Sequence, residues 1–540
     1  MKARRLTALA IALLALAACK PEAVPAAPGD SAAGPVETWA DSLVPWGLRG
    51  AVAVVEDGTT TTSAGFGALA PGGTATIGTG TRMAIGSLTK PITALAIWRL
   101  ADQGRVRLDE TLGELLPGVP ADKAPITVAQ LMSHTAGLAD AHGPDAEQID
   151  RDEGLRRILA EPLLSKPGEE ESYSNSGYTL LAVVIEEASG RAYEDYLRTE
   201  VFATAGMTGS GFHADSVPDG MTEAVGSGAD GPVGTPSRLP PLSWTLRGAG
   251  GVVSTVDDLV ALDRSLFTGS LLSPQTRERA LAETLGEIAP GIRGIAAAGE
   301  TPEVKQTSMW LAAPDEGRTV VVLSADSRVL AEDVAEILGR HLLLGEGLPA
   351  PPPTAAPDPA ADALVAGEYR SETGAVVTVA AHPDGIRLTT EDGRAFGDLF
   401  AVGEPPEGLA SPEETLAVVE GLQDDHYREW LAGKETELGT LDRIELVGAA
   451  PVDAPEPATF LRHRFARGTA LTFWAVSSPH GEVLSVELAA VAPGATFRRS
   501  AVDGYVSFSV AGMPVAGQVS FDDTVMRIRD GDHTVEYHRG

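Results

Sequence analysis

The stretch that decides the fold is MAIGSLTKPITALAIWRL, residues 83–100, in which Ser87 and Lys90 stand at the start of an apolar run with the length of a helix. Three residues along a helix bring two side chains to the same face, so Ser87 and Lys90 are expected side by side. A serine needs a neighbouring base to become a nucleophile, and a helix N-terminus favours the negative charge that develops on its oxygen. Ser-x-x-Lys alone is also typical of a helix cap followed by a surface lysine. The small residue before Ser87 and the apolar helix after it favour the nucleophile.

A second informative stretch is KPGEEESYSNSGYTLLAVVIEEASG, residues 166–190, in which Tyr173, Ser174 and Asn175 precede a segment with helical periodicity. One interpretation is that Ser174 or Asn175 caps this helix while Tyr173 packs at its start. The other is that the Tyr173 phenol lies beside a lysine ammonium. That charge would stabilise the phenolate and let it act as a general base toward Ser87.

These stretches, together with ITVAQLMSHTAGL (126–138) and GAGGVVSTVDDLVALDRSLF (248–267), resemble the class C β-lactamases and the penicillin-binding-protein-like serine hydrolases. The resemblance runs from about residue 37 to residue 345, with the segments in the family's order and spacing. It implies a β-lactamase/DD-peptidase-like α+β fold, in which an antiparallel sheet is flanked by helices and carries a helical subdomain. No cofactor and no metal are expected, because Ser-x-x-Lys chemistry needs none and the histidines show no metal-binding spacing.

Carried over position by position, the resemblance implies roles for individual residues. Ser87 is the acylated nucleophile, Lys90 is its proton partner, and Tyr173 is the general base for acylation and deacylation. Asn175 matches a residue that hydrogen-bonds the amide of the substrate, and the backbone N–H of Ser87 supplies half of an oxyanion hole. His134 falls in a structural segment of the family and is interpreted as a packing residue.

The sequence departs from the family in GIRGIAAAGETPEVKQTSMWLAAPDEG, residues 291–317. Family members carry Lys-Thr-Gly or His-x-Gly on the strand that faces the serine, whereas counting back from the turn at Pro314 gives Ala-Ala-Gly ending at Gly299. Gly299 and Glu300 are therefore the predicted substrate-binding positions. Lys305 is close in sequence and is interpreted as a solvated lysine rather than a replacement cation. Losing such a contact costs about 2–4 kcal/mol of transition-state stabilisation, which argues against an efficient β-lactamase more than against an esterase.

Periodic and apolar runs predict the outline of the first domain. They indicate β-hairpins over 50–69 and 308–326 and helices over 88–100, 126–138, 178–188 and 330–344. Strands at both ends with helices between them indicate an antiparallel sheet that is closed by the two ends of the domain and interrupted by a helical insertion.

Composition divides the chain into a lipoprotein signal peptide (1–19), a flexible tether (20–36), the serine-hydrolase-like domain (37–345), a Pro/Ala-rich linker (346–362) and an accessory module (363–540). Short strand-like runs dominate the accessory module. One stretch, residues 411–433, has helical spacing behind a Ser-x-x-Glu start. A β-rich α+β module is therefore expected.

Cys19, the only cysteine of the chain, follows MKARR and an apolar run that ends in LAA. This pattern is typical of a lipobox, and an ordinary secretory signal that ends near a cysteine is the alternative. Acyl chains on Cys19 would anchor the protein to a membrane face without spanning the membrane. We therefore expect an exported envelope lipoprotein, at the outer membrane facing the periplasm if the cell is Gram-negative.

The charge balance restricts the partners. Asp plus Glu number 75 against 41 Lys plus Arg, which gives a formal net charge of −34. Such a surface repels nucleic acid, so a nucleic-acid partner is excluded. The expected partners are a small-molecule or peptide substrate and the membrane that holds the lipid anchor, with the protein itself a monomer.

Three functions are compatible with these features. The first is a hydrolase that forms an acyl-enzyme at Ser87 and cleaves an ester or amide. The second is a catalytically impaired relative that binds a peptidoglycan-like or peptide ligand. The absence of the Lys-Thr-Gly or His-x-Gly motif near Gly299 favours this function. The third is an envelope interaction protein that works through its C-terminal module. The presence of Ser87, Lys90, Tyr173 and Asn175 together favours the hydrolase.

Overall fold

A computed structural model describes residues 34–140, 143, 147–228, 231–269, 271–352, 354–390, 392, 395, 399, 410–422, 425–451, 457–476, 483–487, 494–500, 504–506, 518–522, 524–530 and 533–540. The chain forms two compact units, one ending at Ala350 and the other running from Pro351 to Gly540. This boundary falls inside the segment predicted as a linker. Cys19 and the predicted signal peptide lie outside the described residues.

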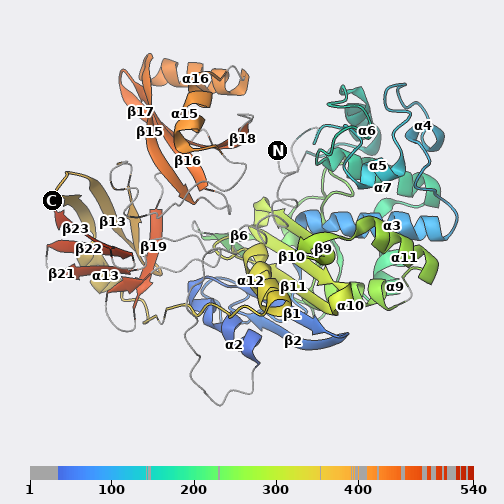
Figure 1. The fold of residues 1–540 in the computed structure, drawn as a ribbon, viewed down its shortest axis with the longest axis horizontal. Helices are drawn as coiled ribbons and strands as arrows, with labels where there is room; N and C mark the ends of the chain where they lie inside the picture. The colour runs from blue at the N-terminus through green and yellow to red at the C-terminus, as the bar shows by residue number, and fades with distance from the viewer. Residues whose placement is uncertain are drawn as a thin grey trace. The chain divides into compact units, whose positions relative to one another are not determined.

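The first unit is built on a six-stranded sheet with the strand order β2-β1-β11-β10-β9-β8 (Figure 1). The strands are β1 (Gly50–Glu56), β2 (Thr59–Phe66), β8 (Gly286–Ala289), β9 (Ile292–Thr301), β10 (Gln306–Ala313) and β11 (Arg318–Ser324). The antiparallel pairs β1–β2 and β10–β11 confirm both predicted hairpins. β1 also pairs with β11, so the two ends of the domain close the sheet as the sequence predicted.

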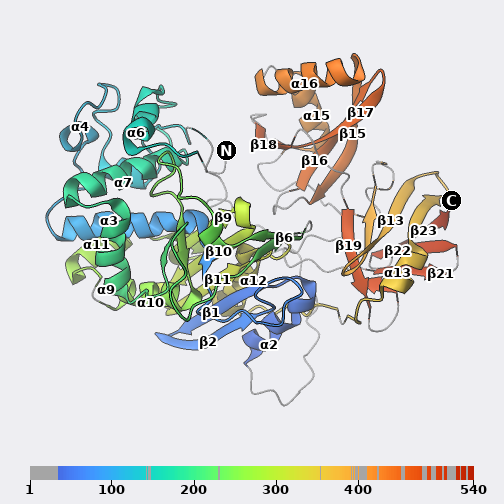
Figure 2. The same cartoon turned by 180° about the vertical axis from the view of Figure 1, so that it is seen from behind.

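Helices cover both faces of this sheet, which explains why all eight residues of β10 are buried. α12 (Ala331–Leu344) packs on β10 and β11, and α10 (Val256–Phe267) packs on β1 and β11 (Figure 2). The helix predicted over 330–344 is thereby confirmed.

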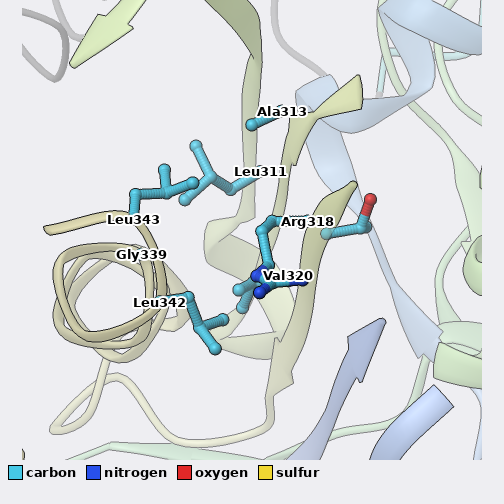
Figure 3. A pocket seen from close by; sticks show the side chains of 8 residues that line it. Leu311, Ala313, Arg318, Val320, Gly339, Leu342 and Leu343 are labelled. Atoms are coloured by element: carbon cyan, nitrogen blue, oxygen red, sulfur yellow. The ribbon is translucent and has the colours of Figure 1, made fainter. Parts of the chain in front are cut away.

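The side chains of β10 and β11 alternate between the two faces. Leu311 and Val320 point toward α12, where they line a small apolar recess with leucines of that helix (Figure 3). Trp310 points the other way, and its indole Nε1 donates a 3.0 Å hydrogen bond to Asp263 of α10. Ser308 shares the Trp310 face, and its Oγ donates to the backbone of the segment before the predicted nucleophile. The recess therefore lies on the far side of the sheet from that segment.

A helical subdomain is inserted between β2 and β8, with α3 (Thr89–Asp102) and α7 (Asn175–Ser189) packed against each other. Both helices confirm predicted segments. α7 starts at Asn175, three residues earlier than predicted, because the Ser174 side chain caps it by accepting from the N–H of Gly177. Nine of the 14 residues of α3 are buried, so this helix lies inside the unit rather than on its surface.

Shorter elements complete the first unit: α2 (Pro35–Ser42), α4 (Leu112–Leu115), α5 (Val128–Met132), α6 (Arg151–Ala160), α8 (Tyr193–Tyr196), α9 (Ala203–Ala205), α11 (Pro274–Thr284), β3 (Met83–Ala84), β4 (Gly211–Phe212), β5 (Gly226–Gly228), β6 (Gly231–Gly234), β7 (Val252–Ser254), η2 (Val44–Trp46), η3 (Gly86–Leu88), η4 (Leu197–Phe202), η5 (Pro236–Arg238), η6 (Pro302–Val304) and η7 (Pro314–Glu316).

The second unit contains a closed barrel with the strand order β12-β13-β14-β19-β20-β21-β22-β23 and a four-stranded sheet with the order β15-β16-β17-β18. Its elements are α13 (Pro359–Val365), β12 (Gly367–Ser371), β13 (Val376–His382), β14 (Gly385–Thr389), α15 (Pro412–Glu420), α16 (Asp425–Leu438), β15 (Leu441–Pro451), β16 (Pro457–Phe465), β17 (Gly468–Val476), β18 (Val483–Glu487), β19 (Gly494–Arg499), β20 (Tyr505–Val506), β21 (Gln518–Asp522), β22 (Val525–Asp530) and β23 (His533–Arg539). The expected β-rich module is confirmed. Within the described ranges of both units, no helix has the length and apolarity that crossing a membrane requires.

Three details differ from the outline that the sequence predicted. α2 begins at Pro35, inside the predicted tether, and α13 begins at Pro359, inside the predicted linker. Proline is compatible with the first helical position, where its missing N–H costs nothing, so a proline-rich composition does not exclude a helix start. The stretch 411–433 forms two helices instead of one segment, because α15 ends with Gly421 as its C-cap.

Candidate active site

Ser87 lies in η3, the turn that leads directly into α3. Its Oγ accepts two hydrogen bonds, from Lys90 Nζ at 3.0 Å and from Tyr173 OH at 2.9 Å. The spacing in the sequence predicted the first contact, whereas the fold brings Tyr173 from 86 residues away. Either neighbour can take the proton of the serine hydroxyl once it has lost its own proton.

The Lys90 side chain is buried, so its ammonium requires polar partners. Besides Ser87, Lys90 Nζ donates a 3.0 Å hydrogen bond to the carbonyl oxygen of Ala249, in the GAGG segment. Nζ also lies 4.6 Å from the centroid of the Tyr173 ring, within the range of a cation–π contact. These contacts hold the positive charge beside both Ser87 and Tyr173.

His134, interpreted from the sequence as a packing residue, supports Tyr173. The two rings stack with their centroids 4.7 Å apart, and His134 Nδ1 accepts a 3.0 Å hydrogen bond from the backbone N–H of Ser174. Burial, helped by the Lys90 charge, lowers the pKa of His134 to about 4, so the ring is neutral and can accept this bond near pH 7. Its backbone φ of +58° is unusual for a residue other than glycine. Such outliers cluster at functional sites.

The surroundings of Tyr173 raise the pKa of its phenol and so favour the protonated form. Burial raises the pKa of Tyr173 to about 12, the hydrogen bond with Ser87 opposes this shift, and the negative charge of Asp140 adds to it. The neutral phenol is therefore the resting form. Forming the phenolate near pH 7 requires additional positive charge close to the ring.

Asn175, the first residue of α7, is oriented by Asp140. The side-chain Nδ2 of Asn175 donates to Asp140 Oδ1 at 2.8 Å, and the backbone N–H of Asn175 donates to the same oxygen at 3.1 Å. The backbone carbonyl of Asp140 accepts in turn from the N–H of Ser176 at 2.8 Å. Sequence reasoning missed Asp140, because it lies 35 residues before Asn175 and in none of the segments that carry the resemblance.

β9 lies against the other side of the Ser87 turn, at the position counted back from the hairpin. A Cβ atom on Gly299 would lie 1.9 Å from the carbonyl oxygen of Ile85. A Cβ atom on Gly86, whose φ is +48°, would lie 2.5 Å from the backbone nitrogen of Glu300. Only glycines permit two backbones to approach this closely. The structure thus places both predicted positions, Gly299 and Glu300, beside the turn that holds Ser87.

The segment of β9 beside Ser87 supplies no cation. Residues 296–301 read Ala-Ala-Ala-Gly-Glu-Thr, so the carboxylate of Glu300 is its single ionisable side chain. Lys305 is the C-cap of η6, and its side chain lies near Gly228 of β5. Among the residues that the structure describes, no three His, Cys, Asp or Glu side chains are grouped so that they could hold a metal ion.

Fold and site together define a β-lactamase/DD-peptidase-like protein, and the comparisons with known proteins identify the family. The family model described as Beta-lactamase matches residues 46–343, more than half of the chain, so the chain belongs to the β-lactamase family. Penicillin-binding protein 4* of Bacillus subtilis is 30% identical over 216 residues, which cover 37% of this chain and 48% of that protein. The D-alanyl-D-alanine-carboxypeptidase/endopeptidase AmpH of Escherichia coli is 30% identical over 171 residues, which cover 30% of this chain and 44% of that protein. The chain therefore spans about half the length of these curated relatives.

One solved structure resembles more of the chain. The octameric penicillin-binding protein homologue from Pyrococcus abyssi aligns with a TM-score of 0.51 and 19% sequence identity, covering 82% of this chain and 95% of that one. At this identity the likeness concerns the fold alone.

Proposed function

We propose that the chain is a serine hydrolase that cleaves an ester or amide through an acyl-enzyme at Ser87. The observation that carries this proposal is the contact of Ser87 Oγ with both Lys90 Nζ and Tyr173 OH. The name of the related AmpH protein, a carboxypeptidase/endopeptidase, supports the same class of reaction.

In this reaction Tyr173, as the phenolate, takes the proton of Ser87 while Oγ attacks the carbonyl carbon of the substrate. The protonated phenol then gives its proton to the leaving alcohol or amine as the C–O or C–N bond breaks, which leaves an ester on Ser87. Water then loses a proton to Tyr173 as its oxygen attacks the ester carbon, and Tyr173 returns a proton to Ser87 Oγ as the bond between Oγ and the acyl carbon breaks and the acid leaves. Lys90 remains protonated and stabilises the phenolate through its position above the ring.

Three further groups bind the substrate in this proposal. The backbone N–H groups of Ser87 and Glu300 stabilise the negative charge on the carbonyl oxygen of the tetrahedral intermediate. Their closeness follows from the two glycines at the β9 contact. Asn175 presents its side-chain carbonyl Oδ1 to a substrate N–H, because its Nδ2 already donates to Asp140.

A second function, binding of a peptidoglycan-like or peptide ligand without turnover, is favoured by two observations. The pKa of Tyr173 is raised to about 12, which opposes its use as a base. The segment of β9 beside Ser87 also lacks a cation that would offset this.

Covalent labelling separates the two functions. The full-length protein is incubated with a fluorophosphonate, and its intact mass is measured beside those of Ser87→Ala and Tyr173→Phe. We expect one phosphonyl adduct on the wild type, none on Ser87→Ala, and labelling of Tyr173→Phe slower by about 10²-fold or more, since a general base contributes this much. A folded wild-type protein that takes up no phosphonate would refute the hydrolase. A fluorescent penicillin that forms a stable adduct, with no turnover of any ester, would support the binding function instead.

We also propose that the protein is an exported lipoprotein anchored through Cys19 at the cell envelope, with its folded units in the periplasm if the cell is Gram-negative. The sequence of residues 1–19 supports this, with its basic start, apolar run and final Leu-Ala-Ala-Cys. Growth with an alkyne-bearing fatty acid tests it. The wild type should acquire the label and Cys19→Ala should not, and an unlabelled, secreted wild type would refute the anchor.

A further inference from the structure

Asp140 is a carboxylate built into the proposed active site by the fold. Its backbone carbonyl accepts from both the N–H and the Oγ of Ser176, and its Oδ1 accepts two hydrogen bonds from Asn175. These bonds hold Asp140, which lies in the loop between α5 and α6, against the first turn of α7. The negative charge of Asp140 and the phenol of Tyr173 are close enough for that charge to raise the Tyr173 pKa.

The hydrogen bonds of Asp140 also decide which atom of Asn175 a ligand meets. An ionised carboxylate only accepts hydrogen bonds, so the atom of Asn175 that faces Asp140 must be Nδ2. The acceptor Oδ1 is then directed away from Asp140. The Asp140 carboxylate and the Asn175 carboxamide oxygen, both at the start of α7, form a pair that suits a positively charged hydrogen-bond donor.

The segment of β9 beside Ser87 offers no cation that would offset Asp140. Residues 296–301 read Ala-Ala-Ala-Gly-Glu-Thr, and the pairing of Glu300 with Thr307 places the Glu300 side chain on the face of the sheet away from the Ser87 turn. Lys90 is the cation beside the nucleophile, but it is buried and donates to Ser87 and to the Ala249 carbonyl. An anionic substrate group would therefore be repelled by Asp140 and find no cation on this segment of β9, whereas a cationic group would be attracted by Asp140.

We propose that the Ser87 site selects esters or amides whose acyl part carries an ammonium group, and that Asp140 is the residue that binds it. This inference rests on the hydrolase function proposed above and names its substrate class. It reverses the charge preference expected of a site with a lysine or histidine on the strand facing the serine.

The same contact would couple binding to chemistry. Without a substrate, the Asp140 charge opposes ionisation of Tyr173. A substrate ammonium beside Asp140 neutralises that charge and places a positive charge near the ring, so it favours the phenolate. The base is then formed chiefly when the correct substrate is bound.

Three substrates that differ only in charge test the selection. The full-length protein is assayed at pH 7 with alanine p-nitroanilide, which carries an α-ammonium group, and with its N-acetyl and N-succinyl derivatives, which are neutral and anionic. Both enantiomers of alanine are used. We expect kcat/KM to be about tenfold or more higher for the ammonium form than for the acetyl form, because a hydrogen bond between charged groups is worth that much. The succinyl form should be the poorest of the three.

Two variants assign the preference to Asp140. Asp140→Asn keeps the shape but removes the charge, so the ratio of kcat/KM for the ammonium over the acetyl substrate should fall toward one. Asp315→Asn removes the same charge at the exposed η7 turn and should leave that ratio unchanged. Fluorophosphonate labelling of Ser87 in each variant shows that the site is folded. In the wild type, the pH dependence of kcat should differ between the ammonium and the acetyl substrate. In Asp140→Asn, the two substrates should show the same pH dependence of kcat.

Protection from labelling gives a readout that does not depend on turnover. Alaninamide should slow phosphonylation of Ser87 more strongly than N-acetylalaninamide, and this difference should vanish in Asp140→Asn. The inference is overturned if the wild type treats the charged and neutral compounds alike in both assays, or if Asp140→Asn keeps the preference. The absence of any phosphonyl adduct would instead refute the hydrolase function itself.

Discussion

Replacing Gly299 by alanine tests whether β9 is seated against the Ser87 turn. The added Cβ would lie 1.9 Å from the carbonyl oxygen of Ile85, whereas ordinary contact begins near 3.4 Å, so strand and turn must separate by about 1.5 Å. The φ of Gly299 is not in the left-handed region, so the cost is steric rather than conformational. Overpacking of this kind destabilises a protein by about 1–3 kcal/mol. A misplacement of ~1 Å at a reaction centre costs about 10²-fold in rate.

Two measurements separate these effects. The rate constant for fluorophosphonate labelling of Ser87 should fall by about 10²-fold in Gly299→Ala. The melting temperature should fall by roughly 2–4 °C for each kcal/mol lost, the value for domains of 150–250 residues, and by somewhat less in this larger unit. Gly286→Ala on the neighbouring strand β8 is the matched control, because a Cβ there meets no atom within 4 Å. If Gly299→Ala were labelled as fast as the wild type, or if Gly286→Ala were equally slow, the close approach of β9 would be refuted.

Three further predictions concern pH and stability. Labelling of Ser87 should accelerate with pH from 7 to 10 and lose this dependence in Tyr173→Phe, because the pKa of about 12 makes the phenolate fraction rise roughly tenfold per pH unit. The first unit should lose stability as the pH falls from 6.5 to 4. Burial lowers the pKa of His134 and of His213 to about 4, so in this pH range the unfolded chain binds more protons than the folded one. Urea unfolding at each pH measures the loss. Asp263→Asn should stabilise the first unit by up to about 3 kcal/mol at pH 7 and by less at pH 4, because burial raises the pKa of Asp263 to about 6 and its ionised form opposes folding above that pH. If the stability gained over the wild type were no larger at pH 7 than at pH 4, this reasoning would be contradicted.

The sequence predicted the contact of Ser87 with Lys90 because that contact is local. Both residues belong to one turn, and helix geometry determines which side chains meet. Tyr173 lies 86 residues from Ser87, so only the resemblance to a family linked the two. The two interpretations of the Tyr173 segment are compatible, because Ser174 caps α7 while Tyr173 reaches Ser87. The cap of α7 and the contact with Ser87 are made by adjacent residues that point in different directions.

Asp140 could not be predicted in this way. Its role depends on the path of the chain before residue 141, which brings its carboxylate to the start of α7. No periodicity or motif encodes such a contact. The starts of α2 and α13 were missed for a different reason: a proline at the first helical position is common to linkers and helix starts, so composition cannot distinguish them.

The β9 segment that ends at Gly299, where family members carry Lys-Thr-Gly or His-x-Gly, shows that steric and electrostatic requirements on one strand are separate. Gly299 must be a glycine, since no other residue lets β9 approach Ile85 and Leu88 so closely. Position 297, where family members carry the lysine or histidine and this chain carries alanine, has no such steric requirement. In the proposed mechanism, Tyr173 needs positive charge nearby when Ser87 loses its proton, and that charge would come from Lys90 together with a group on the substrate. A strand that keeps the glycine and lacks the cation therefore still forms the Ser87 site. In the proposed mechanism, part of the positive charge that stabilises the Tyr173 phenolate then comes from the bound substrate.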